Sequence, residues 1–299
     1  MRTRNPLSQS RKPLSDSMVG LILVLPAIAI FCGIVLYPFV NSVFMSFTDR
    51  SLIFPEYQMV GLENYKNIIQ NPQFLKTLIN TVVFVVFATA VPFLLGFIWS
   101  VILSLKFRGA GFLRGATLVN WIIPGTSISF LWAFIFDTNR GLMNEFLKSL
   151  GLVGDNYNWL GSSSTAMLVV IIARTWQMLP WYMAFLTGGL QSISMEQIEA
   201  ARMDGANNWQ VLKRIIVPGM KPIMLIVLVL GIIGNLQHFD IPQVLTAGGP
   251  AGSTTTLSIM VYREAFSSYR IGTAATIGTI WAVFLALFSY LYSRKAAKE

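Results

Sequence analysis

Long apolar stretches separated by short polar segments dominate the chain and predict a membrane protein. Uncharged stretches lie between Asp16 and Asp49, Lys76 and Lys106, Arg114 and Asp137, Lys221 and Asp240, and Arg270 and Arg294. A further stretch, from Asp155 to Glu196, is interrupted only by Arg174. A bilayer core about 30 Å thick requires roughly 20 apolar helical residues, and an open sheet could not satisfy its backbone there. The pattern therefore predicts an all-α membrane protein with six transmembrane helices, over residues 18–46, 77–104, 115–136, 165–190, 219–239 and 271–293.

Composition agrees with this prediction and excludes several classes of protein. The chain is 54% hydrophobic and 12% charged, whereas a soluble domain is about one-quarter charged. It contains a single cysteine, Cys32, and a single histidine, His238, so a Cys/His metal cluster is excluded. The first apolar run is longer than the roughly 7–15 residues of a signal-peptide core and lacks a small-residue cleavage pattern. We therefore expect it to be a retained membrane anchor.

The basic residues predict the orientation of the helices, because cytoplasmic loops carry an excess of Lys and Arg. Placing both ends of the chain in the cytoplasm puts most of these residues inside, including the basic turn from Lys106 to Arg114. Residues 1–17 and 294–299 then become cytoplasmic tails, and residues 18–293 form a six-helix transmembrane domain. The net charge of +9 is explained by this topology. A nucleic-acid partner is the weaker interpretation, since the charges are spread over several loops.

The polar segment 194–218, between the fourth and fifth predicted spans, has a distinctive pattern. Ser194 followed by Gln197 is typical of a capping box and predicts a helix beginning at about Met195. Gly205 allows a sharp turn, and a second helix over 206–217 is expected to stop at Pro218. The segment is therefore predicted to be a helix–Gly–helix elbow lying across the membrane surface.

The same segment carries a motif. Glu199-Ala-Ala is followed after three residues by Gly205, and after nine more by Ile215-Ile-Val-Pro218. This spacing resembles the EAA loop of ABC importer permeases, with Val217 where Leu is usual. In that family the loop docks a short helix into a cleft of the ATP-hydrolysing subunit. The resemblance implies a role in ATPase coupling for Glu199, Ala200, Ala201, Asp204, Gly205, Ile215 and Pro218. The alternative is an ordinary amphipathic connector, which Glu-Ala-Ala alone would fit equally well.

The resemblance extends over residues 18–293 and points to permeases of carbohydrate uptake. The segments that carry it are Tyr37-Pro38, Ser46–Thr48, Val60–Tyr65, Asn80-Thr81, Gly141–Asn144, Leu190–Ile193, Leu245–Pro250 and Ser253–Leu257. The Gly-Gly-Pro with its following Thr-rich run is similar to the MalF-like member of the permease pair. The chain lacks the extra N-terminal helices and the large periplasmic insert of the maltose protein, so the substrate is not carried over.

This resemblance implies a type I ABC importer (MetI-like) fold and a set of partners. They are a second, MalG-like permease subunit, two ABC ATPase subunits that bind MgATP, an extracytoplasmic solute-binding protein, a carbohydrate substrate and membrane lipid. The chain itself is expected to be non-catalytic and to hold no cofactor. Its expected location is the cytoplasmic (inner) membrane of a bacterium or archaeon, as a multi-pass protein.

Candidate substrate-binding residues lie on three of the predicted spans. They are Trp121 and Gly125; Arg174, Gln177, Met178 and Trp181; and Gly231, Gly234, Asn235 and His238. The resemblance aligns these positions with sugar-lining positions of the maltose-type permease. Aromatic rings stack on sugars, amides bind hydroxyl groups and glycines make room. An unpaired Arg174 would favour a carboxylate or phosphate, which leads to the hypothesis of an acidic, uronate-containing oligosaccharide.

Each of these assignments has an alternative. Arg174 could pair with a carboxylate of the partner permease, and Trp121 and Trp181 could belong to an interfacial aromatic belt. Gly231 and Gly234 could serve close helix packing, and His238 could be a satisfied polar residue near the outer surface.

Two rival functions are less well supported by the residues. A secondary transporter or channel that works without ATP usually needs intramembrane carboxylates, and the predicted helices have Asp137 and Asp240 only at their ends. An ATP-binding loop would require a lysine, which Gly248–Thr254 lacks. The expected mechanism is alternating access, in which closure of the ATPase dimer pushes the elbow and rocks the helices against the partner permease.

Overall fold

The computed structural model describes residues 16–105 and 107–296, which are mainly helical. In the part that is described, strand-like pairing is limited to two isolated bridges, Thr48 with Met59 and Ser51 with Arg270. The predicted tails lie largely outside the described residues, apart from the first and last turns of the terminal helices. The elements are α1 (Asp16–Phe31), η1 (Cys32–Leu36), α2 (Tyr37–Met45), α3 (Glu63–Gln70), α4 (Pro72–Ser104), α5 (Ala110–Ile122), α6 (Gly125–Ile135), α7 (Leu142–Ser149), α8 (Ala166–Gln191), α9 (Met195–Met203), α10 (Asn208–Val211), η2 (Leu212–Ile216), α11 (Val217–Leu236), α12 (Asp240–Thr246), α13 (Leu257–Tyr262), η3 (Arg263–Ser267) and α14 (Ile271–Ala296).

Helices occupy all six positions at which spans are predicted, although they are not equally long. Four are long and apolar enough to cross a bilayer: Ser17–Met45, Pro72–Ser104, Ala166–Gln191 and Asn208–Leu236. Helices α5 and α6 together make a fifth candidate span, and α14 includes a shorter apolar helix over Ile271–Leu287. The all-helical prediction is confirmed, and α14 is 26 residues long, as is α8. At the third position two helices meet at a bend.

The third predicted span, 115–136, is wrong as a single helix. Helices α5 and α6 meet at a bend of 100°. Ile123 is extended, with φ −68° and ψ 129°, because the proline that follows it disfavours helical geometry at that position. Pro124 has no N–H to continue the hydrogen-bond ladder. Helix α6 therefore leaves the direction of α5 and packs against α12.

The sequence pattern predicts that the second helix of the elbow stops at Pro218, and this prediction is wrong. Helices α10, η2 and α11 form one continuous helix from Asn208 to Leu236. A proline ring normally clashes with the carbonyl of the residue four positions earlier. Here a π-helical turn precedes the proline, and the N–H of Val217 donates to Leu212 O, five residues back. The turn η1 lies in the same position before Pro38, where the N–H of Tyr37 donates to Cys32 O.

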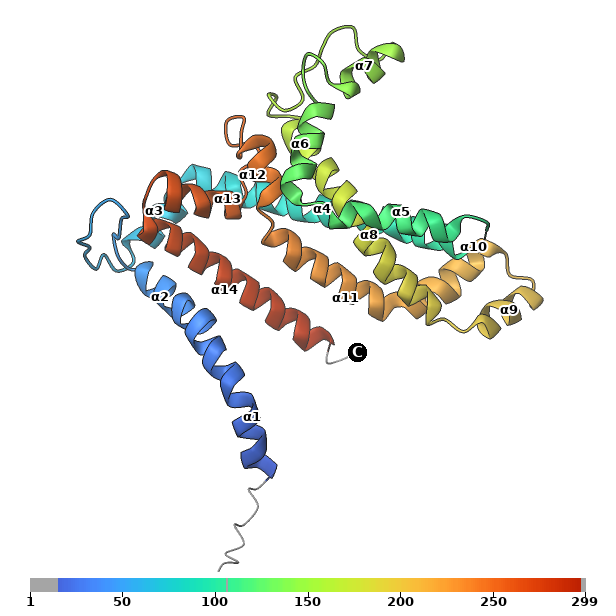
Figure 1. Ribbon diagram of the computed structural model, residues 1–299, viewed down its shortest axis with the longest axis horizontal. Coiled ribbons are helices and arrows are strands. Elements are labelled where there is room, and N and C mark those ends of the chain that lie inside the picture. The colour runs from blue at the N-terminus through green and yellow to red at the C-terminus, as the bar shows by residue number, and fades with distance from the viewer. Residues whose placement is uncertain (1–15, 106, 297–299) are drawn as a thin grey trace, which may run out of the picture.

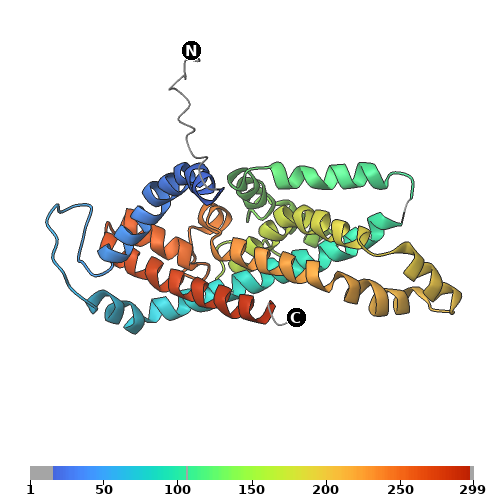
Figure 2. The same cartoon turned by 90° about the horizontal axis from the view of Figure 1, so that it is seen from below.

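Helices α4, α8 and α11 form the centre of the molecule (Figures 1 and 2). Gly96 of α4 allows the close approach of α8, because a Cβ there would lie 2.7 Å from Tyr182 Cβ and 3.0 Å from Met183 N. The main hydrophobic core lies between these helices and α12, with buried Phe84, Ala88, Val170, Ala173, Leu236 and Ile241. This packing fixes the relative positions of the polar residues described below.

The first span stands apart from this centre. None of the residues in its most hydrophobic window is buried, and Figure 1 shows α1 running away from the other helices. Its outer end is attached to α14, where Thr276 Oγ1 donates to Ser46 O at 3.0 Å and the N–H of Gly272 donates to Arg50 O at 2.9 Å. A long apolar helix anchored only at one end leaves its sides for lipid or for another subunit.

Candidate functional site

The elbow between α8 and α11 is closed by a specific turn at the end of α9. The N–H of Ala206 donates to Ala201 O at 2.9 Å, and the N–H of Gly205 donates to Arg202 O at 3.0 Å. This pair of bonds is a Schellman motif, in which the residue after the C-cap takes the left-handed conformation. Gly205 has φ +84°, which residues with a side chain rarely adopt. The glycine of the motif therefore sets the direction of the elbow.

The second limb of the elbow begins with a capping box. Gln210 N donates to Asn207 Oδ1 at 2.9 Å, and Asn207 N donates to Gln210 Oε1 at 2.8 Å. The predicted capping box at Ser194 and Gln197 is wrong, although α9 does begin at Met195 as expected. The backbone at Ser194 is extended, but its side chain accepts no capping bond. The capping box that does form lies at the start of the other limb. The Asn-x-x-Gln pattern at 207–210 could have predicted it.

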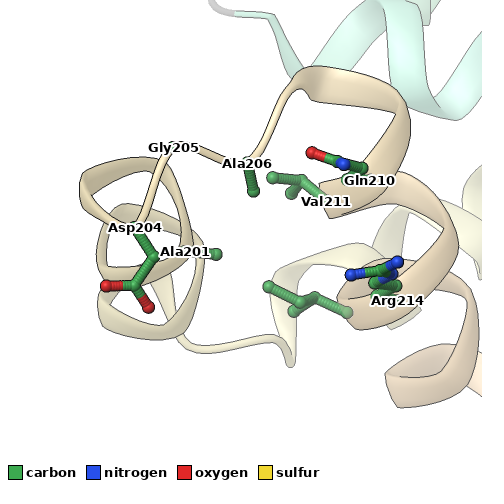
Figure 3. A pocket seen from close by; sticks show the side chains of 8 residues that line it. Ala201, Asp204, Gly205, Ala206, Gln210, Val211 and Arg214 are labelled. Carbon is green, nitrogen blue, oxygen red and sulfur yellow. The ribbon is translucent and has the colours of Figure 1, made fainter.

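A cleft of about 400 Å³ opens between the two limbs (Figure 3). In Figure 3, Asp204 lies on the side of α9, and Gln210 and Arg214 lie on the opposite limb. The residues that line the cleft are Ala201, Asp204, Gly205, Ala206, Gln210, Val211, Arg214 and Ile215. Four of the predicted coupling residues, Ala201, Asp204, Gly205 and Ile215, are among them.

The other predicted coupling residues lie on the outer surface of the elbow. Glu199 and Ala200 are exposed on α9, and Pro218 is exposed on α11 beyond the cleft. Two further residues that the motif does not include are also prominent. Met203 is 89% exposed and Trp209 is 68% exposed, at the ends of the two limbs. Their apolar character within a polar loop was a signal that the spacing argument did not use.

A second cluster of predicted residues forms a buried polar network between three helices. Arg174 of α8 is 7% exposed. Its Nε donates to Asn235 Oδ1 at 2.8 Å, and its Nη1 donates to Gln177 Oε1 at 2.6 Å. Asn235 of α11 in turn donates through Nδ2 to Ala88 O at 2.9 Å and Thr89 Oγ1 at 3.0 Å, both on α4. Within the described chain, Arg174 is thus hydrogen-bonded to neutral amides.

The network reaches the bend between α5 and α6. A Cβ on Gly125 would lie 3.7 Å from Gln177 Nε2 and 3.3 Å from Asp240 Oδ2. The ring of His238 lies beside Phe84, with centroids 6.2 Å apart and planes at 15°. Its Nε2 is buried without a hydrogen-bond partner among the described residues. The structure therefore brings Gly125, Gln177, Arg174 and Asn235 close together, and their role in binding the solute stays a prediction.

The remaining candidates are separated from this network. Met178 and Trp181 are half-buried and pack on a cluster with Phe93, Tyr182 and Val227. Trp121 is 49% exposed on α5, just before the bend. On α11, Gly231 is buried and Gly234 is exposed, so the predicted polar stripe is divided between two sides of the helix.

The two glycines of α11 are expected to respond differently to the same substitution. A Cβ on Gly231 would lie 2.0 Å from Tyr182 Oη, whereas nothing lies within 4 Å of one on Gly234. Gly231→Ala should therefore destabilise the protein by about 2 kcal/mol through overpacking, and Gly234→Ala should change stability little. The melting temperatures of the two purified variants measure the difference. Equal destabilisation would contradict a packing role for Gly231.

Comparison with known protein families decides the class of the protein. Residues 92–296 match the model of the family described as binding-protein-dependent transport system inner membrane component. The chain belongs to this family. The resemblance to ABC importer permeases that its EAA-type loop suggests is thereby confirmed.

Curated relatives cover nearly the whole permease. The trehalose/maltose transport system permease protein MalF of Thermococcus litoralis is 30% identical, over 94% of this chain and 95% of its own length. The lactose transport system permease protein LacF of Rhizobium radiobacter is 30% identical, over 91% and 92%. The sulfoquinovosyl glycerol transport system permease protein SmoG of Agrobacterium fabrum is 28% identical, over 94% and 91%.

A solved structure shares the fold. A chain of a bacterial ABC transporter involved in the import of the acidic polysaccharide alginate aligns with a TM-score of 0.77. The alignment covers 93% of this permease and 95% of that chain, at 21% identity. At this identity the likeness shows the fold of a type I ABC importer permease, as predicted, and carries no information about the solute.

Proposed function

We propose that this protein is the permease subunit of an ATP-driven, binding-protein-dependent carbohydrate importer, where it forms half of a heterodimeric pathway. The observation that carries the proposal is the elbow with its cleft, which presents exposed Glu199 and Met203 beside the turn at Gly205. An exposed cleft at the end of a long helix is suited to a partner that pushes on it. The helix from Asn208 to Leu236 then carries the movement into the membrane.

The expected partners follow from this role. A second, MalG-like permease would complete the pathway, and two ABC ATPase subunits would bind MgATP and dock on the elbow. An extracytoplasmic binding protein would deliver the solute. Relatives named for trehalose/maltose and lactose support a sugar as the transported class. The permease would lie in the cytoplasmic membrane with both termini inside, and it would contribute no catalytic group.

Transport without ATP is not favoured by the described helices. The four long spans and the bent pair contain no Asp or Glu, so they offer no carboxylate to bind a coupling ion. Energy for uptake must then enter from outside these helices. We propose that this energy enters through the elbow, and that the ATPase dimer thereby drives alternating access.

A finer proposal is that the solute is an acidic oligosaccharide. Arg174 is the buried cation at the centre of the polar network, and it forms no ion pair with a carboxylate in the described part of the chain. Its hydrogen-bond partners are neutral amides, so no direct ion pair in the described chain neutralises its charge, and we propose that an anionic solute group does so. The sulfoquinovosyl glycerol relative is in keeping with an anionic sugar.

Sugar-stimulated ATP hydrolysis by the reconstituted complex tests both levels of this proposal. Liposomes would contain both permeases, the ATPase subunits and the binding protein, with a neutral or a uronate-containing oligosaccharide. We expect acidic sugars to stimulate hydrolysis about tenfold or more, and Arg174→Gln to lose most of this stimulation while Arg174→Lys keeps part of it. Equal stimulation by neutral sugars in wild type and Arg174→Gln would keep the importer but refute the acidic solute. Stimulation by no sugar would refute the importer.

A further inference from the structure

Asp240 lies next to the polar network without being part of its hydrogen bonds. It is the first residue of α12 and is exposed. A Cβ on Gly125 would lie 3.2 Å from Asp240 Cβ and 3.3 Å from its Oδ2, and the same Cβ would lie 3.7 Å from Gln177 Nε2. The Asp240 carboxyl group and the Gln177 amide therefore both lie within 4 Å of the position that a Cβ on Gly125 would take.

This position brings a negative charge close to Arg174. The Gln177 side chain touches the guanidinium through its Oε1, at 2.6 Å from Nη1. No ion pair within 4.0 Å joins the Asp240 carboxylate to the Arg174 guanidinium among the described residues, and Gln177 lies between them over Gly125. No hydrogen bond holds the carboxylate of Asp240 in the described chain either. Asp240 is thus a nearby counter-charge that is free to turn away.

The chemistry of such an arrangement distinguishes charged from neutral ligands. A carboxylate that comes to Gln177 and Arg174 enters the field of the Asp240 carboxylate, and like charges a few ångströms apart repel each other. A neutral sugar at the same place experiences little of this repulsion. The charge of Asp240 therefore opposes the charge of Arg174 where an anionic group would bind.

We propose that Asp240 is a specificity-determining residue, whose carboxylate competes with the carboxylate of an acidic oligosaccharide for the neighbourhood of Gln177 and Arg174. This inference rests on the proposed function and deepens it. Asp240 gives the site a resting counter-charge, so that an acidic sugar must displace it outward. Because α12 also packs on α6, that displacement occurs next to the bend at Pro124.

Direct binding to the assembled transporter tests this role separately from the binding protein. The complex, in lipid nanodiscs without its binding protein, would be titrated with trigalacturonate and with maltotriose. We expect Asp240→Asn to lower the ratio of the trigalacturonate Kd to the maltotriose Kd by roughly threefold to tenfold. Asp240→Glu should keep the wild-type ratio. Asp155→Asn, which removes a charge from an exposed outer loop, is the matched control and should also keep it.

An unchanged or increased ratio in Asp240→Asn would overturn the inference, as would equal tightening of both sugars. Failure of wild type to bind trigalacturonate would overturn it too. Asp240→Ser provides a second route if Asp240→Asn fails to fold, because it also removes the exposed carboxylate and should lower the same ratio. Sugar-stimulated ATP hydrolysis with the binding protein present separates failure of the Asp240 inference from failure of the proposed importer function. If stimulation persists and the ratio does not change, the inference fails and the proposed function stands.

Discussion

Replacing Gly205 with valine is expected to abolish uptake while leaving the transporter assembled. Gly205 has φ +84° within the Schellman motif, and a β-branched residue is a strong outlier in that region. The strain of about 1–2 kcal/mol is enough to favour another backbone path, and α9 would then leave its position over the cleft. Because the cleft is shaped by this turn, ATP hydrolysis would no longer be coupled to movement of α11. Uptake into proteoliposomes should fall more than tenfold, with the subunits still purified together.

Two further variants separate coupling from general backbone strain. Gly205→Asn should keep most of the uptake, since asparagine tolerates the left-handed conformation. Gly151 also has positive φ, at +68°, and, as at Gly205, nothing lies within 4 Å of an added Cβ. Gly151→Val therefore introduces comparable strain after α7, far along the chain from the elbow, and should leave uptake near the wild-type level. Loss of uptake in Gly151→Val, or normal uptake in Gly205→Val, would contradict a special role for this turn.

The elbow illustrates what the sequence pattern could predict. Local signals act within a few residues, so the start of α9 at Met195 and the turn at Gly205 were predicted correctly. The same local reasoning failed where an alternative local solution existed. A proline at position 218 predicts a helix end, but a π-helical turn removes the clash and the helix continues. Nothing in the residue types of 212–216 distinguishes the two outcomes.

The substrate-site prediction shows a different limit, which comes from packing between helices. Each helical residue is rotated about 100° from the one before. Gly231 and Asn235 thus lie roughly 40° apart, whereas Gly234 lies roughly 100° from Asn235. A stripe that includes all of them is wider than the surface that α4 and α8 cover, so Gly234 is left exposed. Which part of the stripe is buried depends on Gly96 and Tyr182, which lie on other helices. The periodicity of α11 alone therefore cannot predict it.

The bend at Pro124 is an intermediate case. The proline itself marks position 123 as non-helical, and this was visible in the sequence. Hydropathy continues without a break through 115–136, however, and favours a single span. The 100° turn is stabilised by contacts of α6 with α12, which lies more than 100 residues later in the chain. The direction of α6 is therefore a tertiary property.

Asn235→Leu is expected to be among the most destabilising single substitutions in the centre of the molecule. Neutral hydrogen bonds between membrane helices contribute only about 0.6 kcal/mol each on average. Asn235 also supplies the oxygen that accepts from Arg174 Nε, and Arg174 is 7% exposed. A buried charge that loses its partner costs about 3–5 kcal/mol. The free energy of unfolding should therefore fall by about 3 kcal/mol, most of it because of the guanidinium that remains.

This reasoning predicts that a second substitution restores stability. Arg174→Met keeps much of the apolar stem and removes the charge, so the double variant Arg174→Met/Asn235→Leu should be more stable than Asn235→Leu alone by at least about 1 kcal/mol. Asn64→Leu is a suitable control, since Asn64 donates to two carbonyls, Ser46 O and Thr48 O, with no buried charge beside it. It should cost about 1 kcal/mol.

The melting temperatures of the four purified proteins provide the measurement. If Arg174→Met adds to the damage of Asn235→Leu instead of relieving it, the guanidinium is not the source of the instability, and the network is held together by its neutral bonds. A higher melting temperature of the double variant than of Asn235→Leu would show that the Asn235 amide mainly compensates the buried charge of Arg174, and that folding does not require this charge. A cation that costs stability in the centre of the permease would agree with the anion-binding role that we propose for Arg174.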